Sequence, residues 1–196
     1  MNLNLPNIIT LIRIAISPVF FIFLISEDRA LVQAGCFLFF FGAITDYIDG
    51  WLARKYHEIS KWGKFLDPLA DKFLTTAAFI SFTIMGLIPL WMVIIIITRD
   101  LGTTLMRVYA DSVNMPVATS YSAIVKTFVQ MLFITVLLVL IYFRNSEVLH
   151  PDGILIDKLL HSKAVIVTML ILTLLTVWTA FEYIYKNKML FIGQKR

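Results

Sequence analysis

The chain has 196 residues, of which 59% are hydrophobic and only 15% are charged, and its formal net charge is +4. A soluble domain of this length needs more polar residues to cover its core, so the composition excludes an ordinary water-soluble enzyme. It favours a single membrane domain over residues 1–196. The cations are scattered and form no basic stripe, so we do not expect nucleic acid as a partner.

Hydropathy divides the sequence into about six apolar segments, each near the ~20 residues that a helix needs to cross a bilayer. An all-α integral membrane protein is predicted, with helices over residues 7–26, 31–53, 65–86, 88–109, 119–142 and 163–186. The first segment lacks a basic leading region and a clear cleavage site, so we interpret it as the first span. Cys36 is the single cysteine and is expected to be a packed core residue, because one thiol cannot form an internal disulfide.

The charges of the connecting segments indicate how the spans are oriented. The connection after the first span, residues 26–29, is short and slightly acidic, whereas residues 54–64 after the second span are basic. Four more cations, Lys186, Lys188, Lys195 and Arg196, lie at the end of the last span or after it. Because Lys and Arg collect on the cytoplasmic side, we expect a multi-pass protein of the cell (inner) membrane with both termini and the basic connection in the cytoplasm.

Four aspartates flank the basic connection. Asp46 and Asp49 close the second span, three residues apart, and Asp67 and Asp71 open the third, four residues apart. These spacings put each pair on one helical face, and the connection lets the two faces converge. A carboxylate inside the bilayer costs about 2.5–3.5 kcal/mol, so we expect bound cations to compensate the four charges. Oxygen ligands favour Mg²⁺ or Mn²⁺ over Zn²⁺, and His57 is interpreted as a solvated residue of the connection.

The fixed positions of this region resemble the motif of the CDP-alcohol phosphatidyltransferase family, with the pattern Asp46-x2-Asp49-Gly50-x2-Ala53-Arg54-x8-Gly63-x3-Asp67-x3-Asp71. The resemblance implies about six transmembrane helices around a polar, metal-containing cavity that opens to the cytoplasmic side. It also implies that Asp46, Asp49 and Asp67 are metal ligands and that Asp71 is both a ligand and the general base. Two divalent ions and a homodimer are expected on the same grounds.

The resemblance further implies which residues bind the CDP-alcohol: Asn7, Thr10, Gly50, Ala53, Arg54, Ser60 and Gly63. Gly50 and Ala53 let a nucleotide approach closely, although small residues also favour helix packing in membranes. Arg54 suits a phosphate oxygen through paired hydrogen bonds; without the motif it would be interpreted as an anchor on the cytoplasmic side.

Three cations, Arg99, Arg107 and Lys126, lie in or near the fourth and fifth spans. Cations inside a membrane are costly and face a cavity or a partner. An acceptor alcohol with its own phosphate explains the group, while pairing of one of them with Asp100 is the alternative. The steps Thr98-Arg99-Asp100 and Lys126-Thr127, with residues 5–13, resemble the branch of the family that uses glycerol-3-phosphate, in which Glu usually follows the arginine.

The expected reaction is therefore transfer of the phosphatidyl group from CDP-diacylglycerol to glycerol-3-phosphate, which gives phosphatidylglycerophosphate and CMP in membrane lipid synthesis. Inositol phosphate, phosphatidylglycerol or an amino alcohol as the acceptor stay open as alternatives. A divalent-cation transporter needs metal sites near the middle of the bilayer, whereas the four aspartates lie toward one face. A metal-dependent membrane prenyltransferase needs a larger bundle than 196 residues provide.

Overall fold

The computed structural model describes the chain except residues 1–4, 57–60, 113–116, 118–119, 147–152 and 188–196. For helix residues 5–10, 46–56, 61–68, 71, 111–112 and 153 it describes the backbone alone. The described part consists of helices and connections without a strand: α1 (Leu5–Leu24), α2 (Arg29–Tyr56), α3 (Lys61–Ile84), α4 (Leu90–Ser112), α5 (Tyr121–Arg144), α6 (Gly153–Leu160) and α7 (Lys163–Lys186). The prediction of an all-helical chain is confirmed for this part.

The six long helices overlap the six predicted segments, and their ends differ from the predicted ones by at most four residues. α2 continues to Tyr56 and α3 begins at Lys61, so both helices extend into the connection that was predicted over residues 54–64. The predicted helices leave residues 143–162 between the last two spans, and the structure forms the additional helix α6 there, over Gly153–Leu160. Ile156 and Leu160 of α6 are buried, so packing against the bundle stabilises a helix that is too short to be stable alone.

Two stretches, Tyr121–Arg144 and Ile154–Lys186, are long and apolar enough to cross a membrane. The apolar parts of the other helices are shorter within the described residues, namely Leu11–Leu24, Arg29–Thr45 and Lys72–Ile84. Large side chains such as Phe128, Trp178 and Phe181 are about two-thirds exposed on the outer surface. Such a surface is unfavourable in water and suits a lipid environment.

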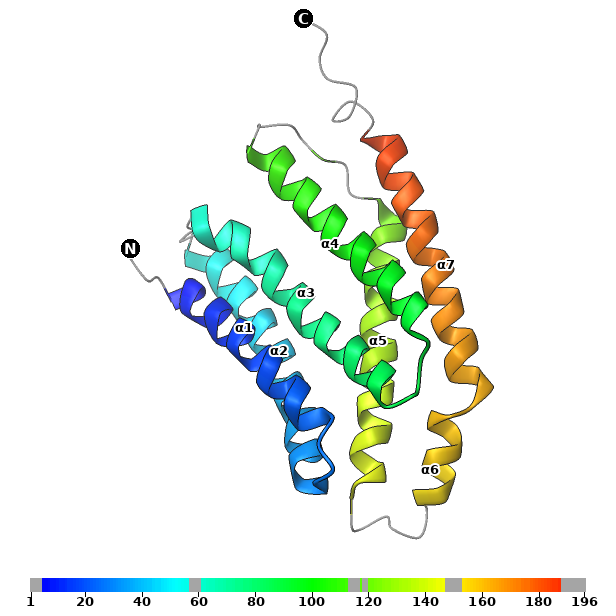
Figure 1. Ribbon diagram of the computed structural model, residues 1–196. Coiled ribbons are helices and arrows are strands. Elements are labelled where there is room, and N and C mark those ends of the chain that lie inside the picture. Colours follow the sequence, from blue (N-terminus) through cyan, green and yellow to red (C-terminus); the bar gives the residue numbers. More distant parts are fainter. Residues whose placement is uncertain (1–4, 57–60, 113–116, 118–119, 147–152, 188–196) are drawn as a thin grey trace, which may run out of the picture.

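The six long helices, α1 to α5 and α7, run alternately in opposite directions, which sorts their ends into two groups. The starts of α1, α3 and α5 and the ends of α2, α4 and α7 lie at one end of the bundle, which we call the upper end after its place in Figure 1. α6 and the start of α7 lie at the opposite end. The predicted site residues that the structure describes lie in the upper half of these helices, except Arg99, which lies near the middle of α4.

α1 packs against both α2 and α3 and so holds the two aspartate-bearing helices together. The rings of Phe20 in α1 and Phe39 in α2 are 5.4 Å apart, and a Cβ atom added at Gly35 would lie 3.2 Å from the backbone N of Leu24. Glycine at position 35 therefore allows a close approach of the two helices. Cys36 is buried in the same core, as predicted.

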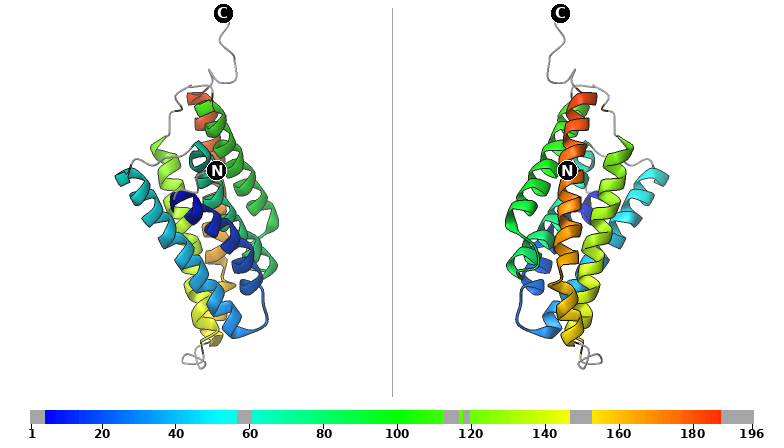
Figure 2. Two further views of the ribbon diagram at one scale, coloured as in Figure 1. Left: turned by 90° about the vertical axis from the view of Figure 1, so that its left-hand side faces the viewer. Right: turned by 90° about the vertical axis from the view of Figure 1, so that its right-hand side faces the viewer.

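α4, α5 and α7 form the second half of the bundle. Figure 2 shows α7 between α4 and α5, and α7 packs against both of them. α3 joins the halves through contacts with α4 and α5. The cavity described below lies where these four helices meet.

Candidate active site

The backbone places the two aspartate pairs at matching depth in an antiparallel hairpin of helices. Asp46 lies ten residues before the end of α2 at Tyr56, and Asp71 lies ten residues after the start of α3 at Lys61. At 1.5 Å per residue, both are about 15 Å from the hairpin end, and Asp49 and Asp67 are both about 10 Å from it. The upper ends of α2 and α3 lie next to each other in Figure 1. The side chains of the four aspartates lie outside the described residues.

The residues expected to bind the CDP-alcohol collect at the same end. Asn7 and Thr10 lie in the first turns of α1, and Gly63 lies in the first turn of α3. Gly50, Ala53 and Arg54 lie in the last two turns of α2. Ser60 is outside the described residues. The helix packing thus brings six of the seven positions to the upper end, while the contacts of their side chains stay predictions.

A cavity of about 470 Å³ opens between α3, α4, α5 and α7, within the roughly 300–1,000 Å³ of small-molecule sites. Three of its lining residues are cations, Lys72, Arg99 and Arg107, and none of the described residues that line it is acidic. Polar side chains complete the wall: Thr103, Thr104, Ser120, Thr127 and Tyr183. The cavity therefore suits a small anionic ligand.

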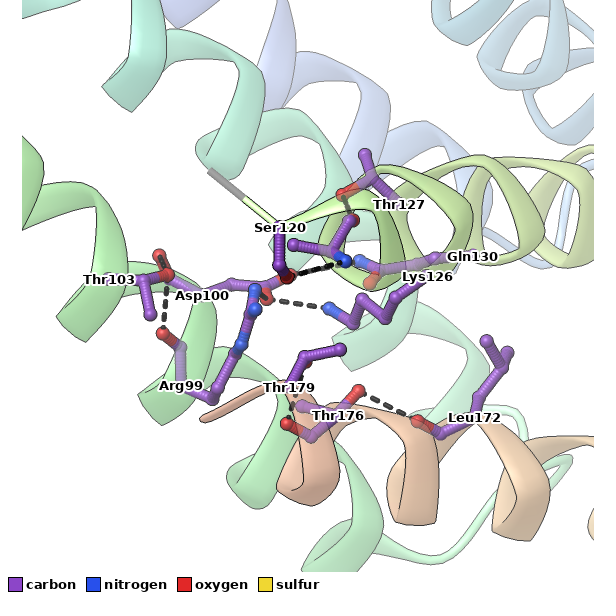
Figure 3. A network of polar contacts seen from close by, with 11 residues as sticks. Arg99, Asp100, Thr103, Ser120, Lys126, Thr127, Gln130, Leu172, Thr176 and Thr179 are labelled. Carbon is purple, nitrogen blue, oxygen red and sulfur yellow. Dashed lines mark hydrogen bonds and ion pairs between the residues drawn. The ribbon is translucent and has the colours of Figure 1, made fainter. Parts of the chain in front are cut away.

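Asp100 pairs with two of the three cations that the sequence groups together. The Nζ atom of Lys126 donates to Oδ1 of Asp100 at 2.6 Å, and the Nη1 atom of Arg99 donates to the same oxygen at 3.1 Å (Figure 3). The Nε2 atom of Gln130 donates to Oδ2 at 3.3 Å. Asp100 and Lys126 are buried, with 5% and 1% of their surfaces exposed.

The structure therefore gives Lys126 a different location from Arg99 and Arg107, which both line the cavity. Lys126 lies on the buried face of α5, where its ammonium group pairs with Asp100, and it does not line the cavity. Pairing with Asp100, the alternative for one of the three cations, is thus found for two of them, Lys126 and Arg99. Arg99 contacts Asp100 and still lines the cavity, and the exposed Arg107 lines it as well.

Lys72 is a cavity residue that the sequence analysis missed. It was recognisable by the argument applied to Arg99, since it is a cation in an apolar helix. It directly follows Asp71 in α3, and the Cα atoms of consecutive residues are about 3.8 Å apart. The cation-lined cavity and the helical face with Asp67 and Asp71 therefore adjoin on one helix.

The start of α5 adds to the positive potential at the cavity. Ser120 caps this helix by accepting a hydrogen bond from the backbone N–H of Ala123 at 3.3 Å, and both residues line the cavity. The N-terminus of a helix carries a partial positive charge. Ser122 donates to Glu182 of α7, which also accepts from Lys186 at 2.7 Å, so this rim is tied to the end of α7.

The four aspartates fit a divalent cation by the chemistry of their donors. They offer only carboxylate oxygens, which suit Mg²⁺ and Mn²⁺, from two helices at matching depth. Among the residues whose side chains the structure describes, no group of three or more His, Cys, Asp or Glu comes together as a metal site. The aspartate motif is thus the strongest candidate metal centre that the sequence offers.

Fold and site together define a helical membrane protein whose carboxylates and cation-lined cavity share one end of the bundle. Residues 3–178 match the family model of CDP-alcohol phosphatidyltransferases. The chain belongs to this family. The resemblance inferred from the aspartate motif is thereby confirmed, and the protein is a member of a transferase family of the membrane.

Curated proteins similar to the chain come from several bacteria. The CDP-diacylglycerol–glycerol-3-phosphate 3-phosphatidyltransferase of Bacillus subtilis (strain 168) is 39% identical over 147 residues, covering 69% of this chain and 76% of the relative. A protein of Mycobacterium tuberculosis (strain ATCC 25618 / H37Rv) named "Probable phosphatidylglycerophosphate synthase" is 34% identical, covering 92% and 80%. The CDP-diacylglycerol–glycerol-3-phosphate 3-phosphatidyltransferase of Rickettsia bellii (strain RML369-C) is 32% identical, covering 76% and 81%.

Proposed function

We propose that this protein transfers the phosphatidyl group of CDP-diacylglycerol to glycerol-3-phosphate, forming phosphatidylglycerophosphate and releasing CMP. Family membership and the names of the similar proteins support the phosphatidyl transfer. The observation that supports a phosphorylated acceptor is the cavity, in which Lys72, Arg99 and Arg107 line a space next to the Asp71 position.

The charge of the cavity distinguishes between the acceptor alcohols. A phosphate monoester carries about −1.5 to −2 charges at neutral pH and pairs well with arginine and lysine. The ammonium group of an amino alcohol would be repelled by three cations. Inositol phosphate shares the phosphate but is a larger molecule, and the names of the similar proteins favour glycerol-3-phosphate.

In the proposed mechanism each group of residues has one task. Arg54, with Gly50 and Ala53 beside it, holds the cytidine diphosphate end of the lipid. Asp46, Asp49, Asp67 and Asp71 would hold divalent cations, which supply neutralisation of the pyrophosphate and stabilisation of the departing CMP.

The acceptor is oriented from the opposite side. Lys72, Arg99 and Arg107 bind the phosphate of glycerol-3-phosphate, so that its free C1 hydroxyl group faces the carboxylates. Asp71 accepts the proton of this hydroxyl group as it attacks the β-phosphorus of CDP-diacylglycerol. Lys126 serves by neutralising Asp100 and not by touching the acceptor.

The same proposal includes a location. The start of α1 and the end of α7 share the upper end with the aspartates, and basic residues follow α7 in the sequence. We therefore place the upper end at the cytoplasmic face of the cell membrane, where CDP-diacylglycerol in the bilayer and glycerol-3-phosphate in solution meet. A multi-pass topology and a homodimer are part of this proposal.

A product assay tests the proposed function. The purified protein is incubated with labelled CDP-diacylglycerol, Mg²⁺ or Mn²⁺, and separately with glycerol-3-phosphate, inositol phosphate, phosphatidylglycerol and an amino alcohol. We expect phosphatidylglycerophosphate and CMP in equal amounts with glycerol-3-phosphate alone. Efficient turnover of a different acceptor would contradict the proposed specificity.

Arg107→Ala is expected to raise the KM for glycerol-3-phosphate by about 10- to 100-fold, because one charge-assisted hydrogen bond is worth about 1.5–3 kcal/mol. The KM for CDP-diacylglycerol should stay close to that of the unmodified protein. Arg144→Ala is a matched control, since Arg144 is half-exposed at the opposite end of the bundle and pairs with Asp157. An unchanged KM for the acceptor would move the phosphate site away from this cavity.

A further inference from the structure

A buried acidic residue stands directly behind the wall of a cavity that suits an anion. Asp100 is 5% exposed and does not line the cavity, yet its carboxylate contacts Arg99, which does. A negative charge at this place weakens the attraction for an anionic ligand. Its presence therefore points to a task other than direct contact with the ligand.

The two carboxylate oxygens of Asp100 accept hydrogen bonds from three side chains. Oδ1 accepts from Lys126 Nζ at 2.6 Å and from Arg99 Nη1 at 3.1 Å, and Oδ2 accepts from Gln130 Nε2 at 3.3 Å (Figure 3). Lys126 and Gln130 belong to α5, whereas Arg99 and Asp100 belong to α4. Two side chains of α5 thus hold the carboxylate in place, and the carboxylate in turn holds Arg99 of α4.

The pairing of Arg99 with its neighbour is unusual for a helix. Consecutive residues of an α-helix point about 100° apart and do not normally face each other. A 3.1 Å contact between Arg99 and Asp100 therefore selects one arrangement of a long, flexible side chain. Nothing comparable holds Arg107 within the described part of the chain, where it is exposed and forms no salt bridge.

We propose that Asp100 is a positioning residue, which holds the Arg99 guanidinium group at the cavity wall ready for the phosphate of the acceptor. Lys126 and Gln130 keep Asp100 in place, so these three residues act on the ligand through Arg99. An arginine held in its bound arrangement loses less conformational entropy when the ligand binds. The inference rests on the proposed function, since it concerns how Arg99 is oriented at the proposed acceptor site.

If Asp100 served only to neutralise Lys126, its role would be structural and a different result would be expected. Loss of that role would lower stability and the amount of active enzyme without a selective effect on the acceptor. The positioning role predicts a selective rise of the acceptor KM that depends on Arg99.

A double-mutant cycle with Asp100→Asn and Arg99→Ala separates the two roles. We expect Asp100→Asn to raise the KM for glycerol-3-phosphate by about 10-fold, with little change in kcat or in the KM for CDP-diacylglycerol. In the Arg99→Ala background, Asp100→Asn should raise the acceptor KM no further. Asp100→Glu keeps the charge and should recover part of the loss.

Two further variants control for folding. Asp100→Asn combined with Lys126→Met leaves no unpaired buried charge, so its melting temperature should recover while its acceptor KM stays high. Asp157→Asn is the matched control, because Asp157 is a half-exposed carboxylate paired with Arg144. Asp157→Asn should change neither the melting temperature nor the acceptor KM.

Additive effects of Asp100→Asn and Arg99→Ala, or a recovered acceptor KM in the variant with Lys126→Met, would overturn the inference. Titration of glycerol-3-phosphate binding to each variant gives a second measure of the same effect. If the unmodified protein neither binds nor uses glycerol-3-phosphate, the proposed acceptor is wrong. The cycle is then run with the phosphorylated acceptor that the product assay finds, and the same two outcomes decide the role of Asp100.

Discussion

Asp71→Asn is expected to lower kcat by about 10²–10⁴-fold, the range typical of losing a general base. Asparagine has nearly the same shape as aspartate but cannot accept the proton of the attacking hydroxyl group. Lys72, the next residue of α3, lines the cation-lined cavity, so Asp71 adjoins the proposed acceptor site. CMP release under saturating substrates measures kcat, and a binding titration with CDP-diacylglycerol shows whether the donor site survives.

Asp46→Asn provides the comparison, because Asp46 is proposed as a metal ligand alone and lies at the same depth in α2 as Asp71 in α3. We expect higher concentrations of Mg²⁺ or Mn²⁺ to restore part of the activity of Asp46→Asn but little of the activity of Asp71→Asn. Near-normal kcat in Asp71→Asn would remove this residue from the role of base. Equal rescue of both variants by metal would leave Asp71 only the role of a ligand.

Removal of divalent cations is expected to lower the rate of transfer by a factor on the order of 10³ or more, because the pyrophosphate of the donor would then face the aspartates without compensation. Dialysis against a chelator, followed by addition of Mg²⁺ or Mn²⁺, measures the loss and the recovery. Substantial turnover in excess chelator would contradict a metal-dependent mechanism.

Binding of Mn²⁺, followed by electron paramagnetic resonance, locates the metal site independently of turnover. Each of Asp46→Asn, Asp49→Asn and Asp67→Asn should weaken Mn²⁺ binding by at least about 10-fold, since each removes a proposed ligand. Asp157→Asn, which changes a half-exposed carboxylate near the opposite end of the bundle, should leave Mn²⁺ binding unaltered. Unchanged affinity in all three motif variants would place the metal elsewhere.

The helices were largely predictable because their apolar segments are long and their connections contain charges or turn-forming residues. The prediction failed at α6, whose eight residues depend on burial of Ile156 and Leu160 against the bundle. Local sequence does not contain that information, since the helix is stabilised by its neighbours. The end of α2 and the start of α3 were missed for a related reason. Residues 54–56 and 61–64, which include four cations, continue helices that are stabilised farther along the chain.

The sequence by itself determined the family and the positions of the four aspartates, because the motif depends on spacing along one helical hairpin and each pair follows the helical repeat. The grouping of the cations was decided only by the tertiary structure. Lys126 turned out to neutralise Asp100, while Lys72 joined Arg99 and Arg107 at the cavity. Spacing along the chain does not fix how α3, α4, α5 and α7 are rotated about their axes, and that rotation decides which cation faces the cavity and which faces a buried carboxylate.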